Sequence, residues 1–149
     1  MAIQFSDGEG ITVSLDVDTY QFPNSDEYWD ANWLQVRGTV THPLGDWHFR
    51  DPCLATMELV QLALWAATVA SGETSTLCFF TEPCLSFELL EAPEPAIALG
   101  FSHEAAPPHW VREEGPFVLR FPLALNPLED LGRAASELLC RFPVKGEQG

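Results

Sequence analysis

The sequence predicts an α+β domain in which about eight strands form antiparallel meander sheets curved around one central helix, with a further helix at the C-terminus. Two observations lead to this expectation. Strand-like segments outnumber helical ones, because only two segments repeat apolar residues at the three-to-four spacing of a helix. The elements also follow the order ββββαββββα, without the repeated strand–helix–strand units of a doubly wound parallel sheet.

Four strands are expected before the first helix, and their alternation of apolar and polar residues is typical of strands with one face in water. Asp7 and Gly8 predict a hairpin between the first two strands. A turn at residues 43–46 leads into the last of the four. These strands are expected at residues 3–5, 11–18, 34–40 and 47–50.

The first helix is expected to begin at Asp51 and Pro52, because aspartate is a good N-cap and proline fits the first helical position. Apolar residues then recur at helical spacing over residues 54–67, and Gly72 supplies a stop. Because the helix is apolar on most of its sides, we expect it to pack under a sheet.

The second half repeats this order of strands followed by a helix. The C-terminal helix is expected to start at Asn126, with Glu129 at the capping-box position, and to end before Pro143. We expect one α+β domain over residues 1–144 and a flexible tail at residues 145–149. The four strands of this half are expected at residues 76–81, 85–91, 96–103 and 117–125.

Composition and net charge indicate which partners and which location are favoured for this protein. The chain has 149 residues, with 22 Asp and Glu against 7 Lys and Arg, so its formal net charge is −15. No basic stripe is present to neutralise phosphates, which disfavours nucleic acids and anionic membrane surfaces as partners. The longest apolar run, residues 59–70, is too short to span a bilayer. The N-terminal residues do not resemble a secretory signal, so we expect a cytoplasmic protein.

Residues that could carry chemistry do not form a recognisable catalytic motif. Asp16 and Asp18 share one strand face, where a solvated pair is the simpler interpretation. His42, Asp46 and His48 surround a predicted turn, where polar residues are expected without any metal. We therefore expect no catalytic residue, no metal and no cofactor.

The cysteines contain no CxxC pair. Their neighbours are mostly apolar, so we expect buried, reduced thiols, with a disulfide or a metal site as the alternative. Cys78 and Cys140 in particular are expected to be buried, which disfavours a nucleophilic role. The four cysteines are Cys53, Cys78, Cys84 and Cys140.

Residues 22–34 form the most informative segment, because aromatic and acidic residues are mixed there without a strand or helix period. One interpretation places Trp33 in the core while polar side chains bond the backbone of a loop. The other is a binding loop with aromatic anchors and an acidic rim, typical of an interface. The two are compatible. The candidate partner-binding residues are Asp26, Glu27, Tyr28, Trp29, Asp30, Asn32 and Trp33.

A family signature matches this segment. The bacterial WapI-type immunity family and its uncharacterised relatives carry N-S-D-x-Y-W-D-x-N-W-L, which resembles Asn24-Ser25-Asp26-Glu27-Tyr28-Trp29-Asp30-Ala31-Asn32-Trp33-Leu34. Elsewhere the chain is similar to the family in the order of its elements. The resemblance implies a small cytoplasmic protein that binds and neutralises the toxic C-terminal domain of a contact-dependent toxin, which cleaves tRNA in the namesake pair. It supplies no catalytic residue.

Three functions are therefore weighed. The first is a non-enzymatic immunity protein that contacts a basic toxin domain, possibly a nuclease, because a net charge of −15 would be steered toward such a surface. The second is a small-molecule-binding or scaffold domain, which requires an apolar pocket lined by residues such as Phe79, Phe87, Leu99 and Leu119. The third is a hydrolase, which requires two acids facing each other in one cleft.

Overall fold

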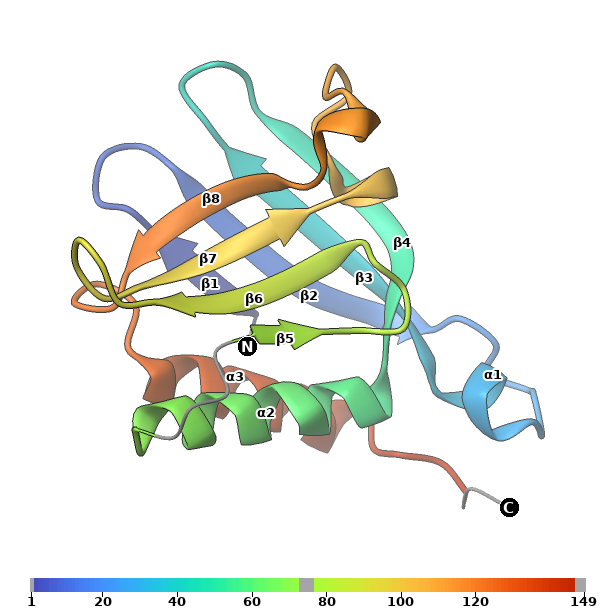
Figure 1. The fold of residues 1–149 in the computed structure, drawn as a ribbon. Coiled ribbons are helices and arrows are strands. Elements are labelled where there is room, and N and C mark those ends of the chain that lie inside the picture. Colours follow the sequence, from blue (N-terminus) through green and yellow to red (C-terminus); the bar gives the residue numbers. More distant parts are fainter. Residues whose placement is uncertain (1, 73–76, 147–149) are drawn as a thin grey trace.

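The protein folds as two four-stranded antiparallel sheets that face each other across a shared core, with two long helices along one end of the pair (Figure 1). This is the α+β fold class that the sequence predicts. The computed structural model describes residues 2–72 and 77–146. Residue 76, the first of one expected strand, lies outside the described residues.

The first sheet is a meander in the order β1-β2-β3-β4. Its strands alternate buried and exposed residues as the sequence predicts, for example with Val13, Leu15 and Val17 buried on β2. Gly38 lies beneath the ring of Phe49, where a Cβ atom would come within 2.2 Å of the ring. The strands are β1 (Ile3–Ser6), β2 (Thr12–Tyr20), β3 (Trp33–Thr41) and β4 (Trp47–Ala55).

The second sheet is also a meander, in the order β5-β6-β7-β8. Its last two strands end earlier than expected. Phe101 ends one strand because the next turn forms the short 3-10 helix η1 (His103–Ala105). Pro122 ends the other because its carbonyl accepts the amides of Leu125 and Asn126 in a turn. The strands are β5 (Leu77–Phe79), β6 (Leu85–Leu90), β7 (Ala96–Phe101) and β8 (Phe117–Pro122).

The predicted start of the first long helix is wrong. Asp51 and Pro52 lie within β4, which stays paired with β3 as far as Ala55, and helix α2 spans Thr56–Ala70. Pairing with β3 therefore outweighs the local capping signal of aspartate and proline. The buried carboxylate of Glu58 instead accepts the amide of Ala55 at 3.0 Å. The helix ends at Ala70, just before the stop predicted at Gly72.

The C-terminal helix α3 spans Leu128–Arg141 and lies beside α2 (Figure 1). Asn126 does not cap it, contrary to the prediction, because Pro127 takes the N-cap position. The Asn126 side chain bonds β1 instead: Oδ1 accepts the amide of Ser6 at 2.9 Å, and Nδ2 donates to the Ser6 carbonyl at 2.8 Å. Asn126, which the sequence placed at a helix start, thus holds β1 against the connection between β8 and α3.

Aromatic rings join the two sheets across the core. Phe5 of β1 contacts Phe87 and Phe121 of the second sheet, with ring centroids 6.2 and 5.3 Å apart. Trp47 of β4 contacts Phe101 at 5.8 Å, and its indole N–H donates to the carbonyl of Ala105 at 2.9 Å. These contacts hold the start of η1 against the edge strand β4.

Candidate functional site

The acidic aromatic segment forms a single helical turn, α1 (Tyr28–Asn32), followed directly by β3. Neither strand nor helix spacing in the sequence predicts this turn. Glu27 caps it, because its Oε2 accepts the amide of Asp30 at 2.8 Å. The carbonyl of Glu27 also accepts the amide of Ala31 at 2.8 Å. Glu27 is therefore both a structural cap and an exposed acid.

Asn32 is the residue that holds this segment in place. Its side chain is 0% exposed. Nδ2 donates to the carbonyls of Tyr28 at 2.8 Å and Lys145 at 3.0 Å, while Oδ1 accepts the Lys145 amide at 2.8 Å. Every polar atom of this side chain is bonded within the chain. Asn32 therefore positions the segment and is not itself a candidate contact residue.

The chain after α3 lies against the same segment (Figure 1). The ammonium of Lys145 lies 3.7 Å from the centre of the Tyr20 ring, and the Tyr20 hydroxyl donates to the Pro143 carbonyl at 2.6 Å. Lys145 belongs to the stretch for which the sequence predicts a flexible tail, and it is bonded here. Residues 147–149 of that stretch lie outside the described residues.

The structural interpretation of the segment is right for its polar side chains, which bond the backbone, and wrong for Trp33. Tyr28, Trp29 and Trp33 are half-buried, so Trp33 is not a core residue. Their rings stack in sequence, with Trp29 centred 6.4 Å from Tyr28 and 6.0 Å from Trp33. The carboxylates of Asp26 and Asp30 are exposed. The structure thus presents a row of partly open rings beside an acidic rim.

The acids of α1 have no cation partner among the described residues, in contrast to those of β2. Asp18 binds Arg37 at 2.9 Å and Arg50 at 2.8 Å, and Asp16 binds Arg141 at 3.4 Å. Asp16 and Asp18 are therefore ion-pair partners on the outer face of the first sheet. With only seven Lys and Arg in the chain, this pairing leaves the acidic rim uncompensated.

The apolar pocket required by the small-molecule alternative is not formed by the residues proposed for it. Phe87, Leu99 and Leu119 are packed in the core, whereas Phe79 is 65% exposed on the outside of β5. The cavity beside Phe87 and Leu138 measures only about 10 Å³. That volume is far below the roughly 300–1,000 Å³ of typical ligand pockets.

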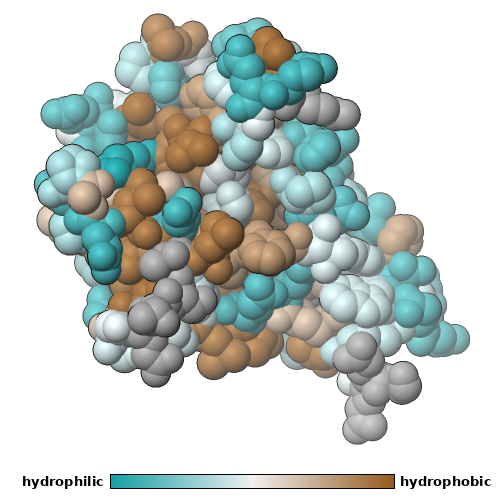
Figure 2. Space-filling model, viewed as in Figure 1, coloured by the Kyte–Doolittle hydropathy of each residue, from teal (hydrophilic) through white to brown (hydrophobic). Residues whose placement is uncertain are grey.

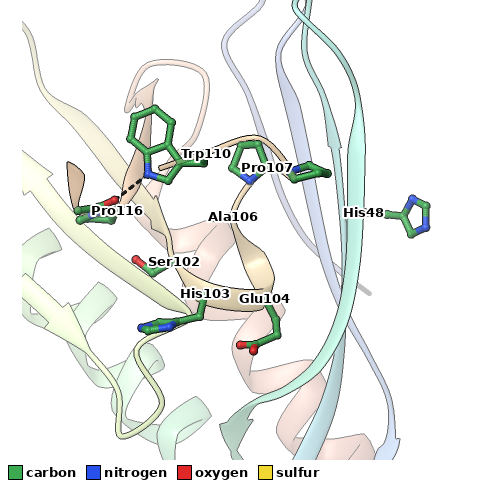
Figure 3. A pocket seen from close by; sticks show the side chains of 10 residues that line it. His48, Ser102, His103, Glu104, Ala106, Pro107, Trp110 and Pro116 are labelled. Carbon is green, nitrogen blue, oxygen red and sulfur yellow. Dashed lines mark hydrogen bonds between the residues drawn. The ribbon is translucent and has the colours of Figure 1, made fainter. Parts of the chain in front are cut away.

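A larger surface hollow of about 450 Å³ lies where the segment after β7 folds back beside β4 (Figure 3). Trp110 forms one wall, and its indole N–H donates to the carbonyl of Gly115 at 2.7 Å. Figure 3 shows that the polar side chains of His48, His103 and Glu104 point in different directions. They do not converge on one point, as groups that orient a bound molecule would.

Sequence reasoning missed a cluster of metal-ligating atoms between the sheets. One ligand atom each from Asp51, Cys53 and Cys84 lies within 4.8 Å of the others. The thiols of Cys53 and Cys84 are free and buried. Because Cys53 lies on β4 and Cys84 in the turn before β6, and no CxxC motif contains them, no local spacing signal marks them. Cys78 is buried as predicted, but the prediction for Cys140 is wrong, because it is exposed on α3.

Two influences act on the ionisation of this cluster. A hydrogen bond with Cys84 and burial raise the pKa of the Cys53 thiol. Burial and the neighbouring carboxylate of Glu104 raise the pKa of Asp51. At the separate thiol of Cys78, burial is the main cause of a pKa raised to about 12. Negative charge on these groups is therefore unfavourable unless a bound cation compensates it.

Comparison with known proteins identifies the chain. Within the described residues, no helix is long and apolar enough to cross a membrane. Neither the curated proteins nor the solved structures contain a match to the chain. A family model does match, and it covers residues 4–143, from β1 to the end of α3. The chain therefore belongs to the immunity protein WapI-like family.

Proposed function

We propose that this protein is a cytoplasmic immunity protein that neutralises a bacterial toxin by direct contact and without catalysis. The match of residues 4–143 to the WapI-like family carries this proposal, because the family name implies a protein partner. The apolar-pocket alternative receives less support, because among the described residues the cavity beside Phe87 and Leu138 measures only about 10 Å³.

The contact surface we propose is the exposed part of the α1 segment: Asp26, Glu27 and Asp30 with the half-buried rings of Tyr28, Trp29 and Trp33. Partly exposed aromatic rings can bury area at small entropic cost, and interfaces are enriched in them. Asn32 lies beneath these groups and holds them through its bonds to Lys145. The surface is therefore preorganised, which reduces the cost of ordering it on binding.

Charge favours a basic toxin domain, such as a nuclease, as the partner. A nuclease presents cationic groups to its phosphate substrate, and acids without a cation partner would be attracted to them. The rim acids Asp26 and Asp30 are of this kind, while Asp16 and Asp18 are already paired. Because the attraction acts through solvent, the association rate should fall as salt screens it.

An immunity gene is expected to lie beside the gene of its toxin, so the test uses a toxin domain found in a neighbouring gene, purified and also co-expressed with the immunity protein. The double reversal Asp26→Lys with Asp30→Lys removes the rim charge and keeps Glu27, which caps α1. We expect this variant to bind about tenfold more weakly or worse, because it replaces attraction with repulsion. It should also protect poorly against the toxin in a growth assay. Calorimetry at low and high salt measures the change.

The matched control reverses two exposed acids of the loop between β6 and β7, Glu91→Lys with Glu94→Lys, which changes the net charge by the same amount. Equal weakening in both double variants would show that only overall charge matters, and the α1 contact surface would be rejected. Full binding by the Asp26 and Asp30 variant would reject it as well. If the wild-type protein neither binds nor protects against that domain, the immunity function itself fails for this pair.

A further inference from the structure

Two thiols and two carboxylates from three parts of the chain meet at the open edge between the sheets. Asp51 and Cys53 lie on β4, Cys84 lies just before β6, and Glu104 lies in η1 after β7. Cys84 donates to Oδ2 of Asp51 at 3.8 Å and is 4.0 Å from Oε2 of Glu104. We propose that these four side chains form a binding site for a divalent cation of the Zn²⁺ class.

The backbone around the cluster is held from several sides. The register between β3 and β4 shifts between the pairs Val36–Asp51 and Leu34–Leu54, which inserts an extra residue into β4 beside Cys53. Such bulges re-aim side chains and are frequent next to functional sites. On the other side, the amide of Ser102 donates to the carbonyl of Cys84 at 2.9 Å, which joins the β6 start to η1.

The distances are close to those that zinc requires. Zinc binds thiolates at about 2.3 Å and carboxylate oxygens at about 2.0–2.2 Å in tetrahedral sites, so its ligand atoms lie about 3.5–3.8 Å apart. The ligand atoms of Asp51, Cys53 and Cys84 lie within 4.8 Å of one another. Side-chain shifts of about 1 Å or less would bring these three to the coordination distance. Glu104, whose Oε2 lies 4.0 Å from the Cys84 sulfur, would move toward them as the fourth ligand.

The chemistry of the donor set selects the metal. Two sulfur and two oxygen donors suit Zn²⁺, whereas Mg²⁺ and Ca²⁺ prefer sites made of oxygen alone. Cys53 and Cys84 are 0% and 1% exposed, so they lie away from solvent. Glu104 is exposed and Asp51 half-buried, and they provide a polar route from the surface to the sulfur atoms.

The electrostatic surroundings also favour a cation. The Cys84 sulfur lies against two carboxylates, 3.8 Å from Oδ2 of Asp51 and 4.0 Å from Oε2 of Glu104. A divalent ion bound there would offset their negative charges. Its binding would release the thiol protons, because zinc binds the thiolate form.

The experiment uses the full chain, kept reduced and stripped of metal with a chelator, and titrates it with Co²⁺ as an optical probe. Tetrahedral Co²⁺ bound to thiolates gives a sulfur-to-metal charge-transfer band, which histidine or carboxylate ligands alone do not give. We expect this band at one Co²⁺ per chain, and we expect added Zn²⁺ to abolish it. Zn²⁺ should also raise the melting temperature, because it binds the folded state.

Variants test whether the four side chains bind the metal ion. Cys84→Ser should abolish the charge-transfer band or shift it strongly, and Glu104→Gln should weaken Co²⁺ binding about tenfold or more, because the ion loses a charged ligand. Because Glu104 is exposed, that variant tests the site even where a cysteine variant fails to fold. Cys140→Ser is the matched control, since its thiol is exposed on α3, and it should leave the titration unchanged.

Three results would overturn the proposal. The first is a reduced, folded wild-type protein that shows no charge-transfer band. The second is loss of the band in Cys140→Ser with full binding in Glu104→Gln, which would place the metal elsewhere. The third is formation of a Cys53–Cys84 disulfide on air oxidation with no Co²⁺ or Zn²⁺ binding by the reduced form, which would make the pair a redox element. All three are distinguishable from a failure to bind the toxin.

Discussion

The outer faces of the two sheets differ in chemistry, although both sheets are four-stranded antiparallel meanders. On the first sheet, Asp16 and Asp18 of β2 pair with Arg37 on the neighbouring β3, and Asp18 also pairs with Arg50 on β4. On the second sheet the exposed side chains include large apolar ones, and Figure 2 shows apolar surface over this side of the molecule. These exposed side chains are Leu77, Phe79 and Val118.

The difference teaches that the inner faces determine this fold and the outer faces are free to specialise. Both inner faces carry buried apolar residues that meet at contacts such as Phe5 with Phe87. The outer face of the first sheet uses three of the seven basic residues, Arg37, Arg50 and Arg141, to neutralise its own acids. The acids of the α1 segment have no cation partner among the described residues, and the proposed contact surface uses them.

The largest expected effect separates inner from outer positions on the second sheet. Phe87, which is 1% exposed and touches rings from Phe5, Trp65 and Phe80, should cost about 3–5 kcal/mol of unfolding free energy when replaced by alanine. Phe79→Ala on the outer face should cost about 0.5 kcal/mol or less. Urea unfolding of both variants measures the contrast.

Phe87→Leu keeps most of the volume and guards against complete unfolding of the alanine variant. Its loss should lie between the other two values. Similar losses for Phe79→Ala and Phe87→Ala would contradict the division into inner and outer faces. They would show that Phe79 is covered in solution, for example by another copy of the chain.

An intermediate effect is expected from the ion pairs of the first sheet. Arg37→Ala removes a partner from both Asp16 and Asp18, and we expect a loss of about 0.2–1 kcal/mol, the usual range for exposed pairs. The loss should shrink as salt rises. Arg133→Ala is the control, because Arg133 has a single exposed partner, Asp130, and should lose less. Equal losses at every salt concentration would deny that the first sheet carries a charge network.

The smallest effect concerns the acid of the first sheet that lies among buried thiols instead of arginines. In the fold, burial and Glu104 raise the pKa of Asp51 above its usual 3.8. A carboxyl whose pKa is raised by folding is harder to ionise in the folded state than in the unfolded state, so its ionisation destabilises the fold. The penalty is therefore absent below pH 3.8, grows as pH rises from 3.8 to the folded pKa, and is complete above the folded pKa.

Asp51→Asn should accordingly stabilise the metal-free protein at neutral pH by less than about 1 kcal/mol, the scale of partly exposed charges. The gain should disappear as pH falls toward 3.8. Urea unfolding with a chelator present, at several pH values, measures it. A gain that does not change with pH would attribute the effect to packing and not to charge.

Much of the fold could be predicted because strand periodicity is a local property. Residues such as Leu15 and Val36 alternate with polar neighbours, and the structure buries both. The segment 22–34 could be recognised as unusual for the same reason, since its mixture of acids and rings stands within one short stretch. The direction of each side chain in it could not be predicted, because Asn32 depends on Lys145 from the far end of the chain.

The sequence by itself determined the element types, their order, the acidic charge and the family signature, because each depends on residues that are neighbours along the chain. Only the tertiary structure decided where β4 ends and α2 begins, because that boundary depends on pairing with β3. Tertiary structure also decided that the Asn126 side chain bonds Ser6 of β1 and does not cap α3. It also brought Cys53 and Cys84 together, since contacts between sheets depend on the path of the whole chain.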